Sequence, residues 1–354
     1  MDYAYSKIVK GVNGDRVMKA KEGQRYIKEG RTRLETVIPL KTPFILYCDP
    51  ASVCNLQCEF CPCGRAHADR WSDEKKNSLG IMDFDIFKKV VDDCREFPDK
   101  IKVLRMYKEG EPLINPNFAK MVEYAKNSGH FLTVDTTSNG TLLNPKLNRE
   151  IVAAGLDRIN ISVEAMDSAG YKKISNVDLD FEKFLDNLRD LYENKGNLHI
   201  FCKTMAENYE TPIEETRERF YGLFGDICDE ITVENMAPCW PEFNTELMSE
   251  EVGVYGNKIQ ECTVCPRLFY ILTINSDGEA SRCIVDWNRR MTLGSVKDYS
   301  VKELWEKMDE YRIEHLKGNR RKLVGCAGCL EIETACVDNI DAYREELLSR
   351  YIGV

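Results

Sequence analysis

Three cysteines near the start of the chain have a spacing that suits iron–sulfur chemistry. Cys54, Cys58 and Cys61 form a C-x3-C-x2-C pattern within one short segment. Three thiolates so close together can hold three corners of a cubane 4Fe–4S cluster and leave the fourth iron open. A zinc site would more often offer four ligands in paired C-x2-C form. The alternative without metal is a loop of free cysteines. Cys63 lies only two residues after Cys61, a poor spacing for a fourth cluster ligand.

A second group of cysteines occupies the last quarter of the chain: Cys262, Cys265, Cys283, Cys326, Cys329 and Cys336. The pairs Cys262-x2-Cys265 and Cys326-x2-Cys329 alone could form a structural zinc site with four thiolates. That reading leaves Cys283 unused. The other cysteines are scattered, and small buried thiols would explain most of them.

Composition excludes several classes of protein. Fifteen cysteines among 354 residues is an odd count, and the N-terminus has no continuous apolar signal segment, so a disulfide framework is disfavoured. The net charge of −10 argues against a nucleic-acid partner. No apolar stretch approaches the roughly 18 residues that a membrane span requires. We therefore expect a cytoplasmic protein with metal or redox chemistry and with neither nucleic acid nor membrane as a partner.

The elements between the two cysteine groups indicate an α/β fold. Six β-rich runs lie at residues 44–48, 101–106, 131–136, 158–163, 198–203 and 230–235. Helical periodicity fills the gaps at residues 84–94, 116–125, 147–154, 181–192 and 213–221. Strands that alternate with helices indicate a parallel sheet, and six units are too few for an eight-stranded barrel. A partial barrel or an open sheet follows, with its chemistry in the loops after the strands.

The chain divides into four predicted parts. Residues 1–40 are read as a polar N-terminal arm, residues 41–236 as the barrel, residues 237–261 as a linker and residues 262–354 as a small cysteine-rich domain. That domain should contain a β-hairpin between residues 268 and 285, turning at Asn275–Gly278, and a C-terminal helix.

The first cysteine group resembles the signature of the radical S-adenosylmethionine family, C-x3-C-x-aromatic-C, with Phe60 in the aromatic position. The resemblance implies a partial (β/α)6 TIM-like barrel in which Cys54, Cys58 and Cys61 ligate a 4Fe–4S cluster. The open iron would bind S-adenosylmethionine, and one electron would cleave it to a 5′-deoxyadenosyl radical. An electron donor such as a flavodoxin or ferredoxin is the implied protein partner.

Further segments resemble the cofactor-binding positions of that family. Gly110, Glu111 and Pro112 resemble its G-G-E-P stretch, whose backbone binds the methionine ammonium, and Ser138 lies in a turn similar to its T-N-G turn. Glu109 replaces the usual first glycine, so its side chain should protrude toward substrate or face solvent. On the fourth strand a period of two places polar residues on one face, where the resemblance assigns them to the ribose hydroxyls: Asn160, Ser162 and Glu164. An internal hydrogen-bond network is the alternative for each.

The second cysteine group resembles the SPASM and twitch extensions that carry auxiliary 4Fe–4S clusters behind many such barrels. The resemblance assigns the ligands of one auxiliary cluster to Cys265, Cys283, Cys326 and Cys329. The full two-cluster pattern needs cysteines that this chain lacks after Cys336. Cys262 and Cys336 could complete a second, partly ligated cluster, donate hydrogen atoms or be inert.

The implied activity is that of a radical SAM oxidoreductase or epimerase acting on a small polar molecule such as a sugar or aminocyclitol. Oxidation needs a base at the barrel mouth, for which Glu109 and Lys203 are candidates beside Arg105 and Glu234. Epimerisation needs a thiol that returns hydrogen, and Cys239, Cys262 and Cys336 are the candidates. A ribosomal-peptide maturase is the alternative, disfavoured because about 40 residues before the first strand are too few for a leader-binding domain. A non-enzymatic metal-binding scaffold is the second alternative.

Overall fold

The computed structural model of the protein describes residues 8–11, 14–23, 30–243, 248 and 251–353. Parts of the predicted N-terminal arm and of the predicted linker therefore lie outside the described residues. The boundaries predicted at residues 40, 236 and 261 stay predictions.

Six parallel strands form the centre of one sheet, in the order β4-β5-β6-β7-β8-β9. Each of the six predicted runs overlaps one of them, which confirms the α/β class and the partial barrel. Leu46, Leu104, Ile159 and Ile200 are completely buried on these strands, as expected for a parallel sheet covered on both faces. The strand bounds are β4 Ile45–Cys48, β5 Ile101–Arg105, β6 Phe131–Ser138, β7 Arg158–Ser162, β8 His199–Met205 and β9 Glu230–Glu234.

The sheet continues beyond both ends of the barrel. β10 (Ile271–Ile274) pairs in parallel with β4, and β11 (Glu279–Ser281) pairs antiparallel with β10, which confirms the predicted hairpin. β12 (Thr292–Ser295) follows antiparallel to β11, and β3 (Lys21–Glu22) joins the opposite edge beside β9. The cysteine-rich C-terminal part is thus joined to the barrel through backbone hydrogen bonds. A separate antiparallel pair is formed by β1 (Ile8–Gly11) and β2 (Gly14–Val17).

Five helices connect the central strands and correspond to the predicted periodic segments: α3 Phe84–Asp93, α4 Phe118–Ser128, α5 Pro145–Ala153, α7 Phe181–Glu193 and α8 Ile213–Phe224. Polar caps fix the first turns of some of them: Asn144 accepts from Lys146 N at the start of α5, and Asp180 accepts from Lys183 N at the start of α7. The remaining helices are shorter: α1 Leu34–Val37, α2 Asp73–Asn77, α6 Ser168–Ser175, α9 Val301–Glu306, α10 Asp309–Leu316, α11 Glu331–Thr334 and the predicted C-terminal helix α12 Arg344–Ile352.

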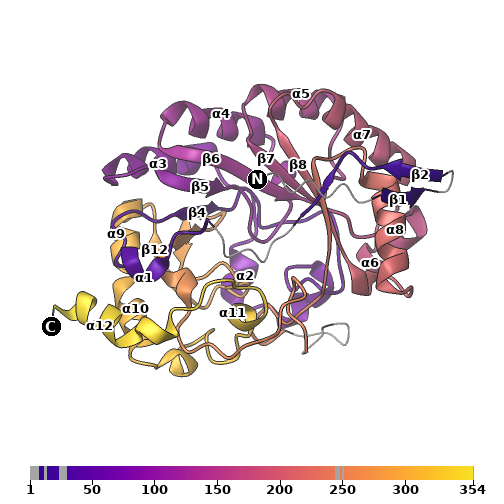
Figure 1. Ribbon diagram of the computed structural model, residues 1–354. Helices are drawn as coiled ribbons and strands as arrows, with labels where there is room; N and C mark the ends of the chain where they lie inside the picture. Colours follow the sequence, from indigo (N-terminus) through magenta and orange to yellow (C-terminus); the bar gives the residue numbers. More distant parts are fainter. Residues whose placement is uncertain (1–7, 12–13, 24–29, 244–247, 249–250, 354) are drawn as a thin grey trace.

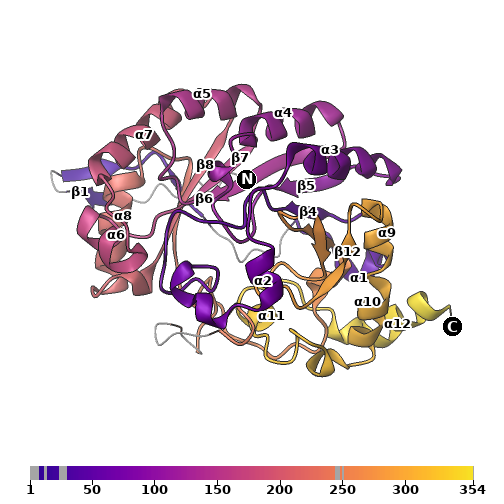
Figure 2. The same ribbon diagram turned by 180° about the vertical axis from the view of Figure 1, so that it is seen from behind.

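The layers place the C-terminal part against the open side of the barrel. Helices α3, α4, α5, α7 and α8 cover the outer face of the curved sheet, whereas α2 and α11 lie on its other side (Figures 1 and 2). One continuous apolar core includes residues of both parts, among them Leu46, Phe87, Leu272 and Trp305. Among the described residues, no helix combines the length and apolar character needed to cross a membrane.

Candidate functional site

The loop after β4 carries the first cysteine group and is held by backbone contacts. Gln57 N donates to Ser175 O (3.0 Å), and Glu59 N donates to Ile174 O (3.2 Å), so the end of α6 supports the middle of the loop. The Sγ atom of Cys58 lies 3.2 Å from Ser175 Oγ. Hydrophobic periodicity did not predict α6, so nothing in the sequence indicated that a helix supports the cysteine loop.

The thiols of this loop lie at the boundary between core and solvent. Cys58 is buried, and Cys54 and Cys61 are half-buried. Burial raises the pKa of Cys54 to about 11, while its Sγ accepts hydrogen bonds from Leu56 N (3.4 Å) and Asn139 Nδ2 (3.8 Å). Cys63 is buried in a small separate apolar cluster with Trp71, Phe243 and Trp287.

The turn after β5 packs backbone against backbone on the cysteine loop. A Cβ atom on Gly110 would lie 2.2 Å from Val53 O and 2.3 Å from Ala51 O, so no larger residue fits. Glu111 N donates to Val53 O at 2.9 Å. The two loops are thus in direct contact, which is the close approach that a cofactor spanning both would require.

Glu111 and Ser138 bond to each other inside the protein. The Glu111 carboxylate accepts from Ser138 Oγ (2.7 Å), Asn139 N (2.7 Å) and Leu113 N (3.0 Å). Burial raises the pKa of Glu111 to about 7, although these three donors act in the opposite direction. Pro112 is also buried, at the start of a short 3₁₀ helix. These side chains join the turn after β5 to the turn after β6.

The polar residues of β7 and of the segment directly after it separate into two groups. Asn160 Nδ2 donates to Thr136 O and Thr137 Oγ1 (both 3.1 Å), and Asn160 accepts from Arg158 Nε (2.8 Å), so its amide is satisfied internally. Ser162 and Glu164 instead line a pocket. Burial raises the pKa of Glu164 to about 7, and Lys203 partly opposes this shift.

That pocket, which we call the mouth pocket, has a volume of about 290 Å³ and lies at the carboxyl ends of β7, β8 and β9. It brings together residues that were predicted separately: Phe60 from the cysteine loop, Ser162, Glu164, Lys203 and Cys239. Lys203 Nζ donates to Glu234 Oε2 at 2.9 Å, and Glu234 also lines the pocket. Apolar residues that sequence reasoning did not identify complete the wall: Met205, Met236, Trp240, Met248 and Val254.

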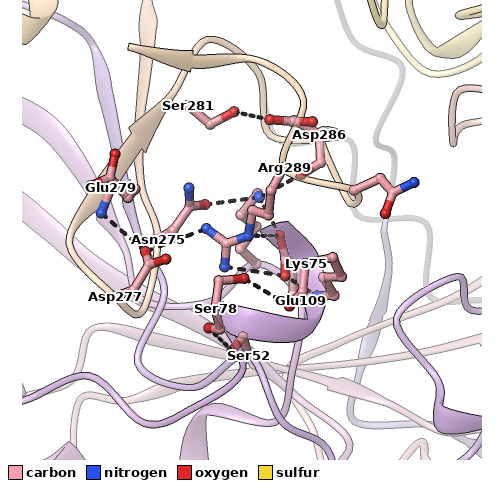
Figure 3. Close-up of polar contacts among 12 residues, drawn as sticks. Ser52, Lys75, Ser78, Glu109, Asn275, Asp277, Glu279, Ser281, Asp286 and Arg289 are labelled. Atoms are coloured by element: carbon pink, nitrogen blue, oxygen red, sulfur yellow. Dashed lines mark hydrogen bonds and ion pairs between the residues drawn. The ribbon is translucent and has the colours of Figure 1, made fainter. Parts of the chain in front are cut away.

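Glu109 does not line the mouth pocket, and the expectation that it faces solvent is wrong. Its carboxylate is completely buried and contacts Lys75, Lys108 and Arg289. Figure 3 shows Arg289, from the segment after β11, pointing toward Glu109 and Lys75. Burial raises the pKa of Glu109, but the three cations outweigh it and lower the pKa to about 2. The reason is distance in sequence: Arg289 comes from the C-terminal part, 180 residues away.

A second cavity lies in the C-terminal part and is lined by Cys265, Cys283, Cys326 and Cys329, the four residues assigned to the auxiliary cluster. We call it the auxiliary cavity; on the same measure as the mouth pocket, its volume is about 20 Å³. Cys262 and Cys336 are buried but do not line it. Among the described residues, no three His, Cys, Asp or Glu side chains converge closely enough to hold a single metal ion. The four thiols instead surround a space.

Basic residues border the auxiliary cavity, and sequence reasoning missed them: Arg282, His315 and Arg320. Burial, with Arg320 and Arg282 nearby, lowers the pKa of His315 to about 3. Arg282 stacks on the Tyr311 ring, with 3.7 Å from Cζ to the ring centroid. Only the position of Arg282 next to Cys283 could have pointed to this group from sequence.

Two family models match the chain. A model of the radical SAM superfamily matches residues 50–219, and a model of the iron–sulfur cluster-binding SPASM domain matches residues 265–330.

Curated relatives match parts of the chain. A tungsten-containing aldehyde ferredoxin oxidoreductase cofactor-modifying protein of Pyrococcus furiosus is 29% identical over 64% of this chain and 59% of its own length. An AdoMet-dependent heme synthase of Methanosarcina barkeri is 22% identical over 78% of this chain and 88% of its own length. A GTP 3′,8-cyclase of Chlorobaculum tepidum is 35% identical over 31% of this chain and 34% of its own length. The chain thus spans less than two thirds of the Pyrococcus relative.

Solved structures share the fold at low identity. BtrN in complex with AdoMet and 2-DOIA aligns with a TM-score of 0.53 at 14% identity, over 84% of this chain and 97% of BtrN. Native anSMEcpe with bound AdoMet aligns with a TM-score of 0.54 at 17% identity, over 88% of this chain and 97% of anSMEcpe.

Proposed function

Because the chain is a member of the radical SAM superfamily with a C-terminal SPASM domain, we propose that it oxidises a carbon–hydrogen bond of a small polar substrate bound in the mouth pocket. The two domains imply 4Fe–4S clusters and S-adenosylmethionine as cofactors. When bound, these groups supply homolytic hydrogen abstraction from carbon and an acceptor for the electron left behind.

The residues of the barrel fit the first cluster and its cofactor. Cys54, Cys58 and Cys61 are our proposed cluster ligands, and the Cys54 thiol already accepts two N–H donors. The Gly110 backbone leaves no room for a Cβ beside the cysteine loop. Ser162 and Glu164 keep their side chains in the mouth pocket, so they are the proposed partners of the ribose hydroxyls. Glu111, Pro112, Ser138 and Asn160 are buried or satisfied within the protein, and we propose that they support the cofactor through the backbone they position.

One observation carries the proposal: the mouth pocket is lined both by the proposed cofactor-binding residues and by an ion pair that can accept a proton. Two-electron oxidation of a carbinol carbon releases a hydrogen atom and then a proton and an electron. Lys203 and Glu234 form the proposed proton-accepting pair, in which the carboxylate takes the proton and Lys203 Nζ donates to Oε2. Glu109 has no role in this step, since its carboxylate is enclosed by three cations.

The test replaces the pair and keeps the clusters. Lys203→Met and Glu234→Gln should each reduce product formation by about 100-fold or more, the usual contribution of a general base. Iron content and the rate at which S-adenosylmethionine becomes 5′-deoxyadenosine should persist. Lys195→Met is the matched control, because Lys195 and Asp229 form a 2.9 Å ion pair before the same two strands begin. Full product formation by both pocket variants would refute the assignment.

Epimerisation is the second candidate, and the position of Cys239 favours it. Cys239 lines the mouth pocket beside Trp240, where a thiol could return a hydrogen atom to a substrate radical. Incubation in deuterated water separates the two reactions. Deuterium fixed at one carbon, lost in Cys239→Ala, would show epimerisation, whereas a mass loss of about two units would show oxidation.

The substrate screen should extend beyond sugars and aminocyclitols. The relatives are named for a cofactor-modifying activity, a heme synthase and a GTP cyclase, and Trp240 and three methionines make one wall of the mouth pocket apolar. Aromatic and sulfur side chains pack well against flat ring systems. Purine, pterin and tetrapyrrole compounds therefore join the panel, together with peptides for the maturase alternative. Failure of the reduced, reconstituted protein to cleave S-adenosylmethionine would favour the scaffold alternative.

A further inference from the structure

The auxiliary cavity is lined by a buried imidazole in which one ring nitrogen is hydrogen-bonded and the other has no partner among the described residues. His315, on α10, is completely buried and lines the cavity. Its Nδ1 accepts a hydrogen bond from Cys265 N at 3.2 Å. An accepting Nδ1 carries no proton, so the ring proton is on Nε2. Nε2 has no hydrogen-bond partner among the described residues.

Two arginines at the same cavity also keep a buried donor unused. The Nε atoms of Arg282 and Arg320 lack partners among the described side chains and backbone. The other nitrogens of Arg320 are occupied: Nη1 donates to Cys329 O (3.0 Å) and Nη2 to Cys262 O (2.8 Å). Arg320 therefore holds two cysteine-bearing segments in place.

Buried N–H groups without acceptors are costly, so the cavity is built for an occupant that accepts hydrogen bonds. Cys265, Cys283, Cys326 and Cys329 provide the other part of the wall, so the occupant must also bind thiolates. A cubane cluster fits both requirements, because its sulfides and ligating sulfurs are acceptors and its total charge with four thiolates is negative. This step rests on the auxiliary cluster of the proposed function.

We infer that His315 Nε2 donates a hydrogen bond to a sulfur of the auxiliary cluster and, with Arg282 and Arg320, raises its reduction potential. The reduced cluster carries one more negative charge than the oxidised cluster, so N–H donors and cations stabilise it more. His315 is thus a positioning residue for electron transfer. It makes the auxiliary cluster a better acceptor for the electron that substrate oxidation releases.

The experiment measures the potential of the auxiliary cluster alone. The parent protein is the full chain with Cys54, Cys58 and Cys61 replaced by alanine, reconstituted without oxygen and titrated with EPR detection. His315→Leu should lower the ratio of reduced to oxidised cluster at a fixed potential about tenfold, equivalent to about 59 mV for a one-electron couple. His315→Gln keeps a donor near Nε2 and should remain close to the parent. His130→Leu, directly before β6, is the control and should cause no shift.

The outcomes separate this inference from the proposed function. An unchanged titration of His315→Leu at full iron content overturns the inference and leaves the cluster in place. Equal shifts in the Leu and Gln variants also overturn it, because they report ring shape rather than the donor. If His315→Leu binds no cluster, Arg282→Gln decides, with a lowered potential in support and an unchanged one against. A parent protein without a redox-active cluster contradicts the proposed electron acceptor and, with it, the inference.

Discussion

Glu109 is a negative charge enclosed by positive ones. Lys75, Lys108 and Arg289 are almost completely buried and all pair with this carboxylate, although Lys108 also donates to Asn275 Oδ1 and Asp286 O. Removing one member of a buried ion pair leaves charges uncompensated and costs about 3–5 kcal/mol. We therefore expect Glu109→Gln to lower the free energy of unfolding by that amount, measured by anaerobic chemical denaturation. Glu210→Gln, which removes the exposed pair with Lys173, should leave the stability unchanged.

A second prediction concerns the pH dependence of stability and rests on Asp49. Both of its carboxylate oxygens are buried without a hydrogen-bond partner among the described residues. Burial, reinforced by Glu109, raises the pKa of Asp49 to about 7, although Arg289, Lys108 and Lys75 oppose this. The folded state then binds a proton more tightly than the unfolded state. The contribution of Asp49 to the free energy of unfolding therefore becomes less favourable as the pH rises toward 7.

The substitution Asp49→Asn removes this titration. Its stabilising effect on the melting temperature should increase between about pH 4 and about pH 7 and then stay constant. Asp83→Asn is a poor control because Asp83 caps α3, so Asp69→Asn, outside the α-helices, serves instead. A stabilisation equal at all pH values would contradict the raised pKa.

At the scale of elements, the turn after β5 and the loop after β4 must approach each other. Gly110→Ala places a methyl group against the carbonyl oxygens of Val53 and Ala51, and the cysteine loop must move to accept it. We expect loss of the first cluster, observed as lower iron content and weaker visible absorbance. Gly222→Ala, inside α8 with nothing near its Cβ, should be neutral or stabilising by up to about 1 kcal/mol. Full iron content in Gly110→Ala would show that the loops separate without consequence.

The central elements were predictable because their signals are local. Strands β4 to β9 are apolar runs of the right length, and the hairpin of β10 and β11 has its turn residues in sequence. The support of the cysteine loop by α6 was not, because it depends on carbonyls of Ile174 and Ser175. The partners of Glu109 and the donors around the auxiliary cavity come from distant segments, so no window of sequence contains them. Cysteine spacing indicated which residues to compare, and only the fold showed which side chains surround them.

At the scale of the whole molecule, the two cysteine groups make a prediction about metal content. The reconstituted chain should contain about eight irons, and Cys58→Ala or Cys283→Ala should each bring the content to about four. A double variant should hold almost none. Combined iron, zinc and sulfide analysis is the measurement. A content of four irons and one zinc would contradict the auxiliary cluster and favour a structural zinc site at the C-terminal cysteines.

The parallel pairing of β10 with β4 has a consequence for how the protein is made. During synthesis β4 leaves the ribosome early, and β5 can cover one of its edges soon afterwards. The other edge has no strand to pair with until Ile271–Ile274 has been translated. An exposed apolar strand edge invites association between nascent chains. Production of truncated chains that stop before β10 should therefore yield aggregates, and slow translation through the linker should favour the binding of chaperones to the unfinished sheet.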